Sequence, residues 1–140
     1  MEEWRELVIS EAQSWLGTPW HHEGRIKGKG VDCAMFVYEV FIKCNLIPRF
    51  ELFEYSEQWA LHRSEEKFLK VLERYGRQTN KSLPGNVIIF KYGRCFSHGG
   101  IIVNWPIIIH AFKHTGCVVY EDVLCSGFKN RKRLIYEVGL

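Results

Sequence analysis

One cysteine lies where the start of a helix would make its thiol reactive. Cys33 follows Asp32 at the opening of residues 31–44, an apolar stretch that predicts a buried helix with Asp32 as its N-cap. A thiol is a nucleophile only as a thiolate, and a helix N-terminus lowers the pKa of a thiol. Backbone N–H groups at the same helix end can also face a developing oxyanion. The position therefore indicates a catalytic nucleophile, with a small buried hydrophobe as the alternative.

Two histidines could serve that nucleophile. His98 lies just before one expected strand, and His110 lies inside the next. If the two strands form a hairpin about Trp105-Pro106, the histidines are neighbours across the sheet. His98 could then take the proton of Cys33 while His110 orients His98, which is the usual order of nucleophile, base and orienting residue. The constellation predicts a cysteine hydrolase.

Zinc binding is the other chemistry that cysteines and histidines offer. The five cysteines are an odd set without a C-x-x-C pair, which argues against a zinc module and against a disulfide framework. The candidate ligands match no usual spacing, so we expect no metal; they are His21, His22, Cys95, His98 and His110. Apart from metal binding, His21 and His22 either line the cleft before the nucleophile or lie in a solvated loop. The remaining cysteines are interpreted as ordinary thiols: Cys44, Cys95, Cys117 and Cys125.

Helices precede strands along the chain. Helical spacing predicts a first helix over residues 2–16 that ends at Gly17, and a second helical region over 56–75 with a break near Ser64 and an end at Gly76. Short β-branched runs then predict strands over 87–90, 100–104, 107–112, 117–121 and 133–138. This order predicts a single α+β domain over residues 1–140, with N-terminal helices packed on an antiparallel sheet.

Composition excludes several classes of protein. The chain has 140 residues, of which 46% are hydrophobic, so it can bury a core and is not intrinsically disordered. A net charge of +3 is too small to indicate nucleic-acid binding, and the basic run 129–133 is interpreted as a solvated turn, with weak attraction to an anionic polymer as the alternative. No run of about eighteen apolar residues predicts a membrane span. No secretory signal is visible at the N-terminus.

Five sequence blocks, in this order, resemble the NlpC/P60 cysteine peptidases, with the order and spacing most similar to short cell-wall peptidases found with phage tail genes and gene-transfer-agent clusters. The blocks are residues 17–22, 30–34, 84–90, 97–101 and 109–111. The resemblance implies a papain-like α+β fold in which Cys33 attacks an amide of a peptidoglycan stem peptide, typically between the γ-carboxyl of D-glutamate and a diamino acid. It implies His98 as general base, His110 as the third member and no metal or organic cofactor.

Three residues depart from the family pattern. Trp20 stands where members usually carry a tyrosine beside the catalytic cysteine, and an indole can donate only through N–H. Asn86 stands where an aspartate is usual, and Met35 stands where a small residue is usual. Residues expected to contact the substrate are Trp20, His21, Asp32 and Ser97.

The resemblance also implies partners and leaves alternatives open. We expect a peptidoglycan peptide as substrate, a phage-tail-like protein as partner, and neither nucleic acid nor membrane insertion. The expected location is the bacterial cytoplasm, followed by incorporation into a phage or phage-like particle. One alternative is a thiol amidase or acyltransferase, which would need a hydrophobic acyl tunnel. The other is a largely structural tail-assembly protein with little turnover.

Overall fold

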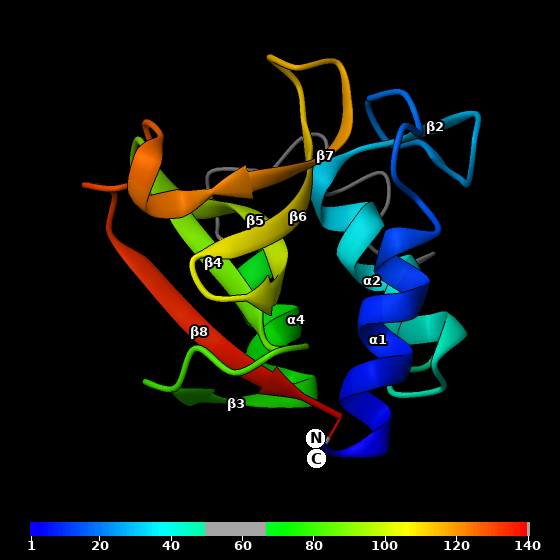
Figure 1. Cartoon of the computed structure of the whole chain (residues 1–140), viewed down its shortest axis with the longest axis vertical. Coiled ribbons are helices and arrows are strands. Elements are labelled where there is room, and N and C mark those ends of the chain that lie inside the picture. The colour runs from blue at the N-terminus through cyan, green and yellow to red at the C-terminus, as the bar shows by residue number, and fades with distance from the viewer. Residues whose placement is uncertain (50–66, 140) are drawn as a thin grey trace.

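The computed structural model describes residues 1–49 and 67–139, in which helices cover one face of an antiparallel sheet (Figure 1). The helices are α1 (Glu3–Gln13), α2 (Cys33–Lys43) and α4 (Lys67–Tyr75), with a short 3-10 helix η2 (Val123–Cys125). The main sheet has six strands in the order β3-β8-β4-β5-β6-β7, and a separate pair is β1 (Arg25–Ile26) with β2 (Gly30–Val31). The six strands are β3 (Gly76–Thr79), β4 (Val87–Tyr92), β5 (Cys95–Asn104), β6 (Ile107–Phe112), β7 (Cys117–Asp122) and β8 (Arg133–Val138).

Helix α1 forms the first part of the predicted segment. Val8 and Ala12 are buried one turn apart, and the acidic residues of the first turn favour the positive end of the helix dipole. The helix ends at Gln13 rather than at residue 16, and the following turn closes at Gly17, whose φ of +86° suits a glycine. Among the described residues, no helix is long and apolar enough to span a membrane.

Helix α2 is the predicted buried helix, and its cap is confirmed. Asp32 Oδ1 accepts a hydrogen bond from the backbone N–H of Met35 at 2.9 Å, which satisfies one of the unpaired donors of the first turn. Every residue from Ala34 to Phe41 is buried. Because α2 is enclosed on nearly all sides, the position of Cys33 at its N-terminus is set by packing along the whole helix.

Helix α4 confirms the end of the second helical region, whereas the segment 56–66 with its expected break near Ser64 lies outside the described residues. Gly76 was predicted only to end the helix. It also begins β3, a strand that the sequence prediction missed because GRQT is polar and lacks alternation. A Cβ on Gly76 would lie 2.5 Å from the carbonyl oxygen of Glu137, so glycine permits the close pairing of β3 with β8.

The remaining predicted strands are confirmed; β4 extends to Tyr92 and β7 to Asp122, and β5 shows the largest extension. Strand β5 begins at Cys95 instead of residue 100, because Gly93 adopts a φ of +64° and a tight turn pairs Tyr92 with Cys95. The predicted hairpin about Trp105-Pro106 is confirmed by the antiparallel pairing of β5 with β6. His98 consequently lies inside a paired strand rather than at its entry.

Both faces of the central strands are apolar. The face toward the helices carries Val87, Ile89, Ile101 and Ile109, which join the core formed with α1, α2 and α4. The opposite face carries a second cluster, completed by the η2 region, that comprises Ile88, Phe90, Ile102, Ile108, Val123, Phe128 and Ile135. The strands are therefore anchored from two sides, which fixes their register and the direction of each side chain.

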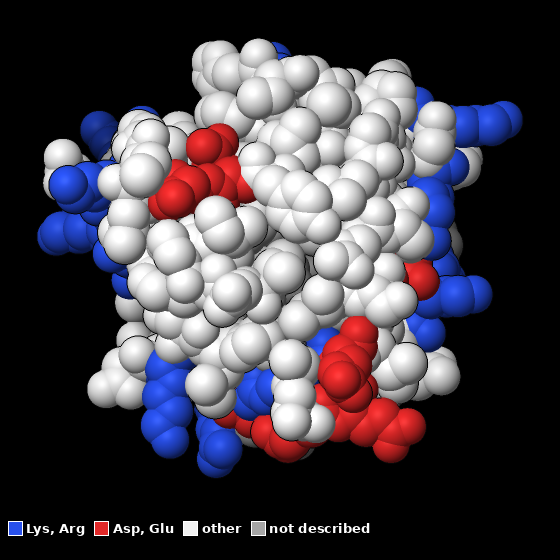
Figure 2. Space-filling view, in the orientation of Figure 1, with Lys and Arg blue, Asp and Glu red and all other residues white. Residues whose placement is uncertain are grey.

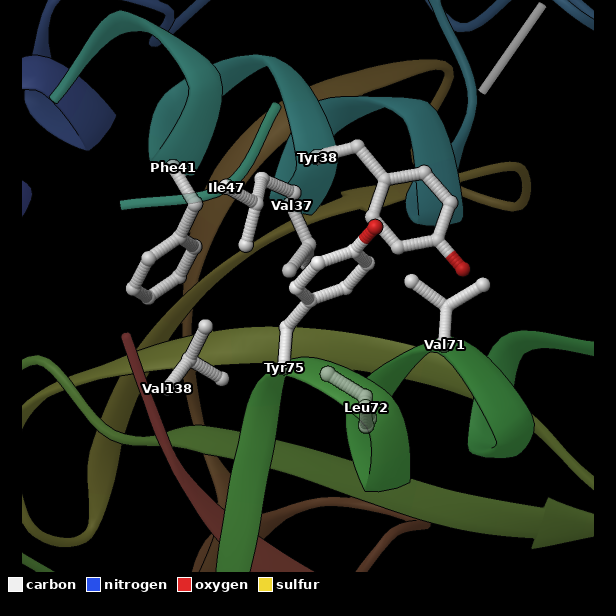
Figure 3. A pocket seen from close by; sticks show the side chains of 8 residues that line it. All are labelled: Val37, Tyr38, Phe41, Ile47, Val71, Leu72, Tyr75 and Val138. Atoms are coloured by element: carbon white, nitrogen blue, oxygen red, sulfur yellow. The ribbon is translucent and has the colours of Figure 1, made fainter. Parts of the chain in front are cut away.

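A small apolar cavity lies between α2 and α4 (Figure 3). Its volume is about 10 Å³, which is hardly room for one water molecule and far below the roughly 300–1,000 Å³ of typical ligand pockets. Its walls are entirely apolar or aromatic and comprise Val37, Tyr38, Phe41, Ile47, Val71, Leu72, Tyr75 and Val138. We interpret it as a packing space between the two helices.

Candidate active site

The N-terminus of α2 places the Cys33 thiol against the strand that carries His98. The thiol donates a hydrogen bond to the carbonyl oxygen of Ser97, with 3.6 Å between sulfur and oxygen, and Ser97 directly precedes His98 in β5. The Cys33 side chain is partly exposed. The thiol therefore lies at the surface of the enclosed helix, next to the predicted base.

Asp32 is buried, with 1% of its surface exposed, and it organises the approach to Cys33. Beyond the cap at Met35, its Oδ2 accepts a hydrogen bond from the backbone N–H of Glu23 at 2.9 Å. The carboxylate thus ties the loop before β1 to the first turn of α2. These contacts support a structural role for Asp32 in addition to the substrate contact that the sequence analysis expected.

His98 and His110 form a hydrogen-bonded pair. His98 Nε2 lies 2.8 Å from His110 Nδ1, and the two rings meet edge to face. Ile101 pairs with Ile109, and this register continued one step places Gly100 opposite His110. A Cβ on Gly100 would lie 3.1 Å from the Cβ of His110, so the missing side chain leaves room for the diagonal contact between the imidazoles.

Both imidazoles are neutral at neutral pH. Burial, with smaller contributions from the nearby His110 and Arg131, lowers the pKa of His98 from 6.5 to about 3. Burial lowers the pKa of His110 to about 4. A hydrogen bond between two neutral imidazoles carries one proton, and either ring can supply it. The tautomer of the pair therefore decides whether His98 presents a basic nitrogen to Cys33.

Aromatic rings enclose His98. Phe128 stacks on it with ring centroids 5.4 Å apart, and Tyr92 meets it edge-on at 5.7 Å. Arg131 lies over the ring of Tyr92 at 3.6 Å from the centroid, and its Nη1 donates to the carbonyl oxygen of Lys91 at 3.1 Å. Burial raises the pKa of Tyr92, opposed by Arg131 and reinforced by the charges of Cys33 and Glu121, so the phenol stays protonated.

The sequence analysis missed this surrounding shell. Arg131 belongs to the basic run that was interpreted as a solvated turn, and nothing local indicates that the turn packs beside His98. Glu121 was missed as well, and its Oε1 lies 3.5 Å from Nε2 of His110. A signal was available for Glu121 alone, because a hairpin of the strands 107–112 and 117–121 brings it near His110.

The other expected substrate contacts belong to two separate segments of the chain. Trp20 is half-buried beside Val31, stacks with His22 at 6.4 Å and faces the Lys113 ammonium at 5.4 Å. His21 is exposed, and its Nδ1 lies 2.9 Å from the carbonyl oxygen of His22. Trp20 and His21 thus belong to the segment that leads into β2 and α2, while Ser97 contacts the thiol through its carbonyl.

Two departures from the family pattern have structural explanations. Asn86 is fully buried, and its Oδ1 accepts from Arg5 Nη1 at 2.8 Å while its Nδ2 donates to the carbonyl of Lys81 at 3.0 Å. Glu137 supplies the carboxylate for Arg5, at 3.3 Å from Nη2. An amide at position 86 therefore keeps both hydrogen bonds. Met35 is 1% exposed and fills the core rather than a pocket.

The arrangement of the cysteines and histidines bears on metal and disulfide chemistry. Across residues 1–49 and 67–139, no group of three or more histidine, cysteine, aspartate or glutamate side chains is arranged to hold a metal ion. No disulfide joins any of the five cysteines, all of which are described. The chemical groups brought together are those of a thiol beside an imidazole pair.

Comparisons with known proteins identify the fold and the family. No curated protein sequence matches the chain. The NlpC/p60 domain of the peptidoglycan hydrolase SagA is similar with a TM-score of 0.61 and 16% sequence identity, over 94% of this chain and 97% of that one. NlpC1 from Trichomonas vaginalis gives a TM-score of 0.71 at 15% identity, over 99% of this chain and 48% of that one. An NlpC/P60 family protein from Bacillus cereus ATCC 10987 gives 0.67 at 18% identity, over 93% of this chain and 39% of that one.

These similarities show a shared papain-like α+β fold. The chain spans less than half of the Trichomonas and Bacillus chains, whereas it spans nearly all of the SagA domain. The profile of the NlpC/P60 family matches residues 17–135, which include every residue of the thiol and imidazole site. The protein therefore belongs to the NlpC/P60 family, a family of cysteine peptidases.

Proposed function

We propose that the chain hydrolyses an amide bond in the stem peptide of peptidoglycan, with Cys33 as nucleophile, His98 as general base and His110 as the residue that orients His98. The hydrogen bond between His98 and His110, placed next to the thiol at the start of α2, is the observation that carries the proposal. The three roles of a cysteine peptidase are then filled by residues of α2, β5 and β6. The SagA domain, named as a peptidoglycan hydrolase, supports the choice of substrate.

The chemistry follows from these positions. Cys33 gives its proton to Nδ1 of His98 and its sulfur attacks the amide carbon, while backbone N–H groups of the first turn of α2 face the oxyanion. The protonated His98 then gives its proton to the leaving amine, which leaves a thioester on Cys33. Water then attacks the thioester with His98 again as base, the carbon–sulfur bond breaks to release the carboxylic acid, and the Cys33 sulfur recovers a proton from His98. Although burial disfavours a charged His98, the thiolate formed in the same step offsets that cost.

The bond that we propose joins the γ-carboxyl of D-glutamate to a diamino acid. Such a substrate is rich in carboxylates, and Arg131 lies fixed over Tyr92 on one side of His98. Trp20 and Lys113 offer an indole and a cation where family members usually carry a phenol. These two cations suit a polar, anionic peptide.

Digestion of purified peptidoglycan and of synthetic stem peptides tests the proposal, with the products read by mass spectrometry. We expect a new amine on the diamino acid with the wild type, none with Cys33→Ala, almost none with His98→Ala and a small residual rate with His110→Ala. Cys125→Ala is the matched control, because Cys125 is an exposed thiol outside the site, and it should retain full activity. Full activity of Cys33→Ala would overturn the proposal.

Two further aspects rest on the family resemblance and are tested separately. Association with a phage-type tail predicts that the chain co-purifies with tail components encoded beside it, and a chain that sediments alone in such a lysate would contradict this. The alternative of an acyltransferase predicts acyl transfer from a lipid amide or ester, and the cavity between α2 and α4 is small for such a chain. Equal rates on lipid and stem-peptide substrates would favour the alternative.

A further inference from the structure

His110 has a buried nitrogen that faces a carboxylate. Its side chain is fully buried, and within the described part of the chain Nε2 makes no hydrogen bond. Among the described residues, Glu121 is the acidic group that faces it, with Oε1 3.5 Å from that nitrogen. This separation is at the outer limit of a hydrogen bond, so the contact is electrostatic in the resting site. A buried N–H without a partner is costly, and Glu121 is the group positioned to reduce that cost.

The sheet fixes this approach. In the pairing of β6 with β7, His110 lies opposite Val119 and Ile108 lies opposite Glu121. Residues 110 and 121 are therefore diagonal neighbours on one face, in the same relation that joins His98 to His110 across β5 and β6. The Glu121 side chain keeps 23% of its surface exposed. A polar chain thus runs over three adjacent strands from Glu121 through His110 to His98.

The direction of the proton in this chain determines the chemistry of His98. If His110 carries its proton on Nε2, its Nδ1 accepts from Nε2–H of His98, and Nδ1 of His98 keeps the lone pair that a base needs. If His110 carries its proton on Nδ1, that N–H donates to Nε2 of His98. The proton of His98 then lies on its Nδ1, and this nitrogen has no lone pair to accept the proton of Cys33. A carboxylate beside His110 Nε2 stabilises the first arrangement.

We propose that Glu121 is a positioning residue of this site, which holds His110 protonated at Nε2 and thereby keeps Nδ1 of His98 basic toward Cys33. The inference rests on the proposed function in one respect, the transfer of a proton from Cys33 to His98. Glu121 touches neither the thiol nor the substrate in this role. It acts through His110, as the carboxylate of a Ser-His-Asp triad acts through one histidine.

Charge supports the same role. When Cys33 gives up its proton, a positive charge arises on an imidazole pair that burial otherwise keeps neutral. Arg131 faces His98 from the turn before β8 and opposes that charge. Figure 2 shows acidic atoms gathered over the end of β7 and basic side chains near the start of β8. Glu121 therefore provides the compensating negative charge, and attraction to the new cation favours a closer contact.

The pH dependence of this effect is determined by the groups around Glu121. Burial, followed by the charge of Asp122, raises the pKa of Glu121. Tyr92 lies in the field of both Glu121 and Cys33, and its own raised pKa keeps it neutral. The carboxylate consequently takes up its proton at a higher pH than an ordinary glutamate. The support for basic His98 should weaken as the pH falls through that raised value.

The experiment compares Glu121→Gln, which keeps an acceptor but not the charge, with Glu121→Ala, which keeps neither. Asp122→Asn is the matched control, because it removes a neighbouring charge and retains the oxygen that caps η2. Three properties are measured: the tautomers of His98 and His110 by nitrogen-15 NMR, the pH profile of Cys33 alkylation by iodoacetamide followed by mass spectrometry, and turnover of a stem peptide.

We expect the wild type and Asp122→Asn to hold both imidazoles in the Nε2–H form. Glu121→Ala should populate the other tautomer, alkylate more slowly and lose roughly 10- to 100-fold in kcat at an unchanged KM. Glu121→Gln should have an alkylation rate and a kcat between those of the wild type and Glu121→Ala. It should also lack the fall in alkylation rate at acidic pH that protonation of Glu121 causes. Nδ1–H as the dominant form of His110 in the wild type would overturn the inference, as would an alkylation profile unchanged in both Glu121 variants. Neither NMR nor alkylation needs the peptide, so a failure of the proposed substrate leaves this test decisive.

Discussion

The buried imidazole of His110 should make the fold sensitive to acid. Its pKa is about 4 in the folded chain, against 6.5 for an ordinary histidine. Between these values the unfolded chain binds one more proton than the folded chain, so stability rises with pH in that window. The contribution is complete above pH 6.5 and is lost as the pH falls toward 4. Replacing His110 by asparagine, which does not titrate and can still accept from His98, should remove this part of the acid sensitivity.

The size of the effect follows from the two pKa values. Between pH 7 and pH 5, a group that titrates near 6.5 when unfolded and near 4 when folded lowers the free energy of unfolding by about 2 kcal/mol. Other ionisable groups add to the total change, so the difference between two variants carries the prediction. Removing His110 also lets the pKa of His98 rise toward its ordinary value, which further reduces the loss of stability as the pH falls. Between pH 7 and pH 5, the free energy of unfolding of the His110→Asn variant should therefore fall by about 2 kcal/mol less than that of the protein with His110.

Urea unfolding followed by tryptophan fluorescence at pH 7, 6 and 5 measures this difference. A Cys33→Ala parent keeps the thiolate out of the titration. Val119→Ala is the matched control, because Val119 pairs with His110 in the sheet and carries no ionisable group. It should lower stability at every pH and leave the loss between pH 7 and pH 5 unchanged. An equal loss in His110→Asn and its parent would refute the reasoning and would mean that the imidazole is hydrated in solution.

Further predictions concern the groups that hold the site in place, and urea unfolding measures each. Arg5→Met should cost about 3 kcal/mol, because it leaves buried Asn86 Oδ1 and the Glu137 carboxylate without their guanidinium. Glu2→Gln, which alters the exposed end of the same network, should leave the free energy of unfolding nearly unchanged, and equal costs of the two substitutions would contradict the burial argument. Gly99→Ala should cost about 2 kcal/mol or more, because a Cβ there would lie 2.6 Å from the ring of Phe68. Gly127→Ala meets nothing within 4 Å and should be nearly neutral, so similar costs at both glycines would show that the strand yields easily.

The sequence predicted the elements that carry a hydrophobic period and missed those that do not. Strands β4 to β8 and helices α1 and α2 follow from apolar spacing, and the turns between strands follow from glycine and proline. Strand β3 is polar and pairs at a sheet edge, so only its partner β8 identifies it. Strands β1 and β2 are two residues long each, which is too short for a hydrophobic period to show. Both depend on contacts between distant segments, which local pattern does not encode.

The same limit applies to the site. Cys33, His98 and His110 could be singled out because their residue types are reactive and their positions are set by one helix start and one hairpin. Tyr92 and Arg131 could not, because their place beside His98 comes from the packing of the turn before β8. The direction of the imidazole hydrogen bond was equally invisible in sequence. It depends on which charges the fold gathers around the pair.

The three central polar groups are held by sheet register rather than by local chain geometry. His98, His110 and Glu121 meet through two diagonal contacts, and a shift of one residue in either strand pairing would turn one of them to the opposite face. The two apolar clusters that enclose the strands oppose such a shift, because it would turn their buried side chains to the opposite face of the sheet. Glycine at position 100 adds the space that the first diagonal contact needs. Stability of the core and basicity of His98 are therefore coupled, and substitutions that loosen β5, β6 or β7 should lower the reactivity of Cys33 before they unfold the chain.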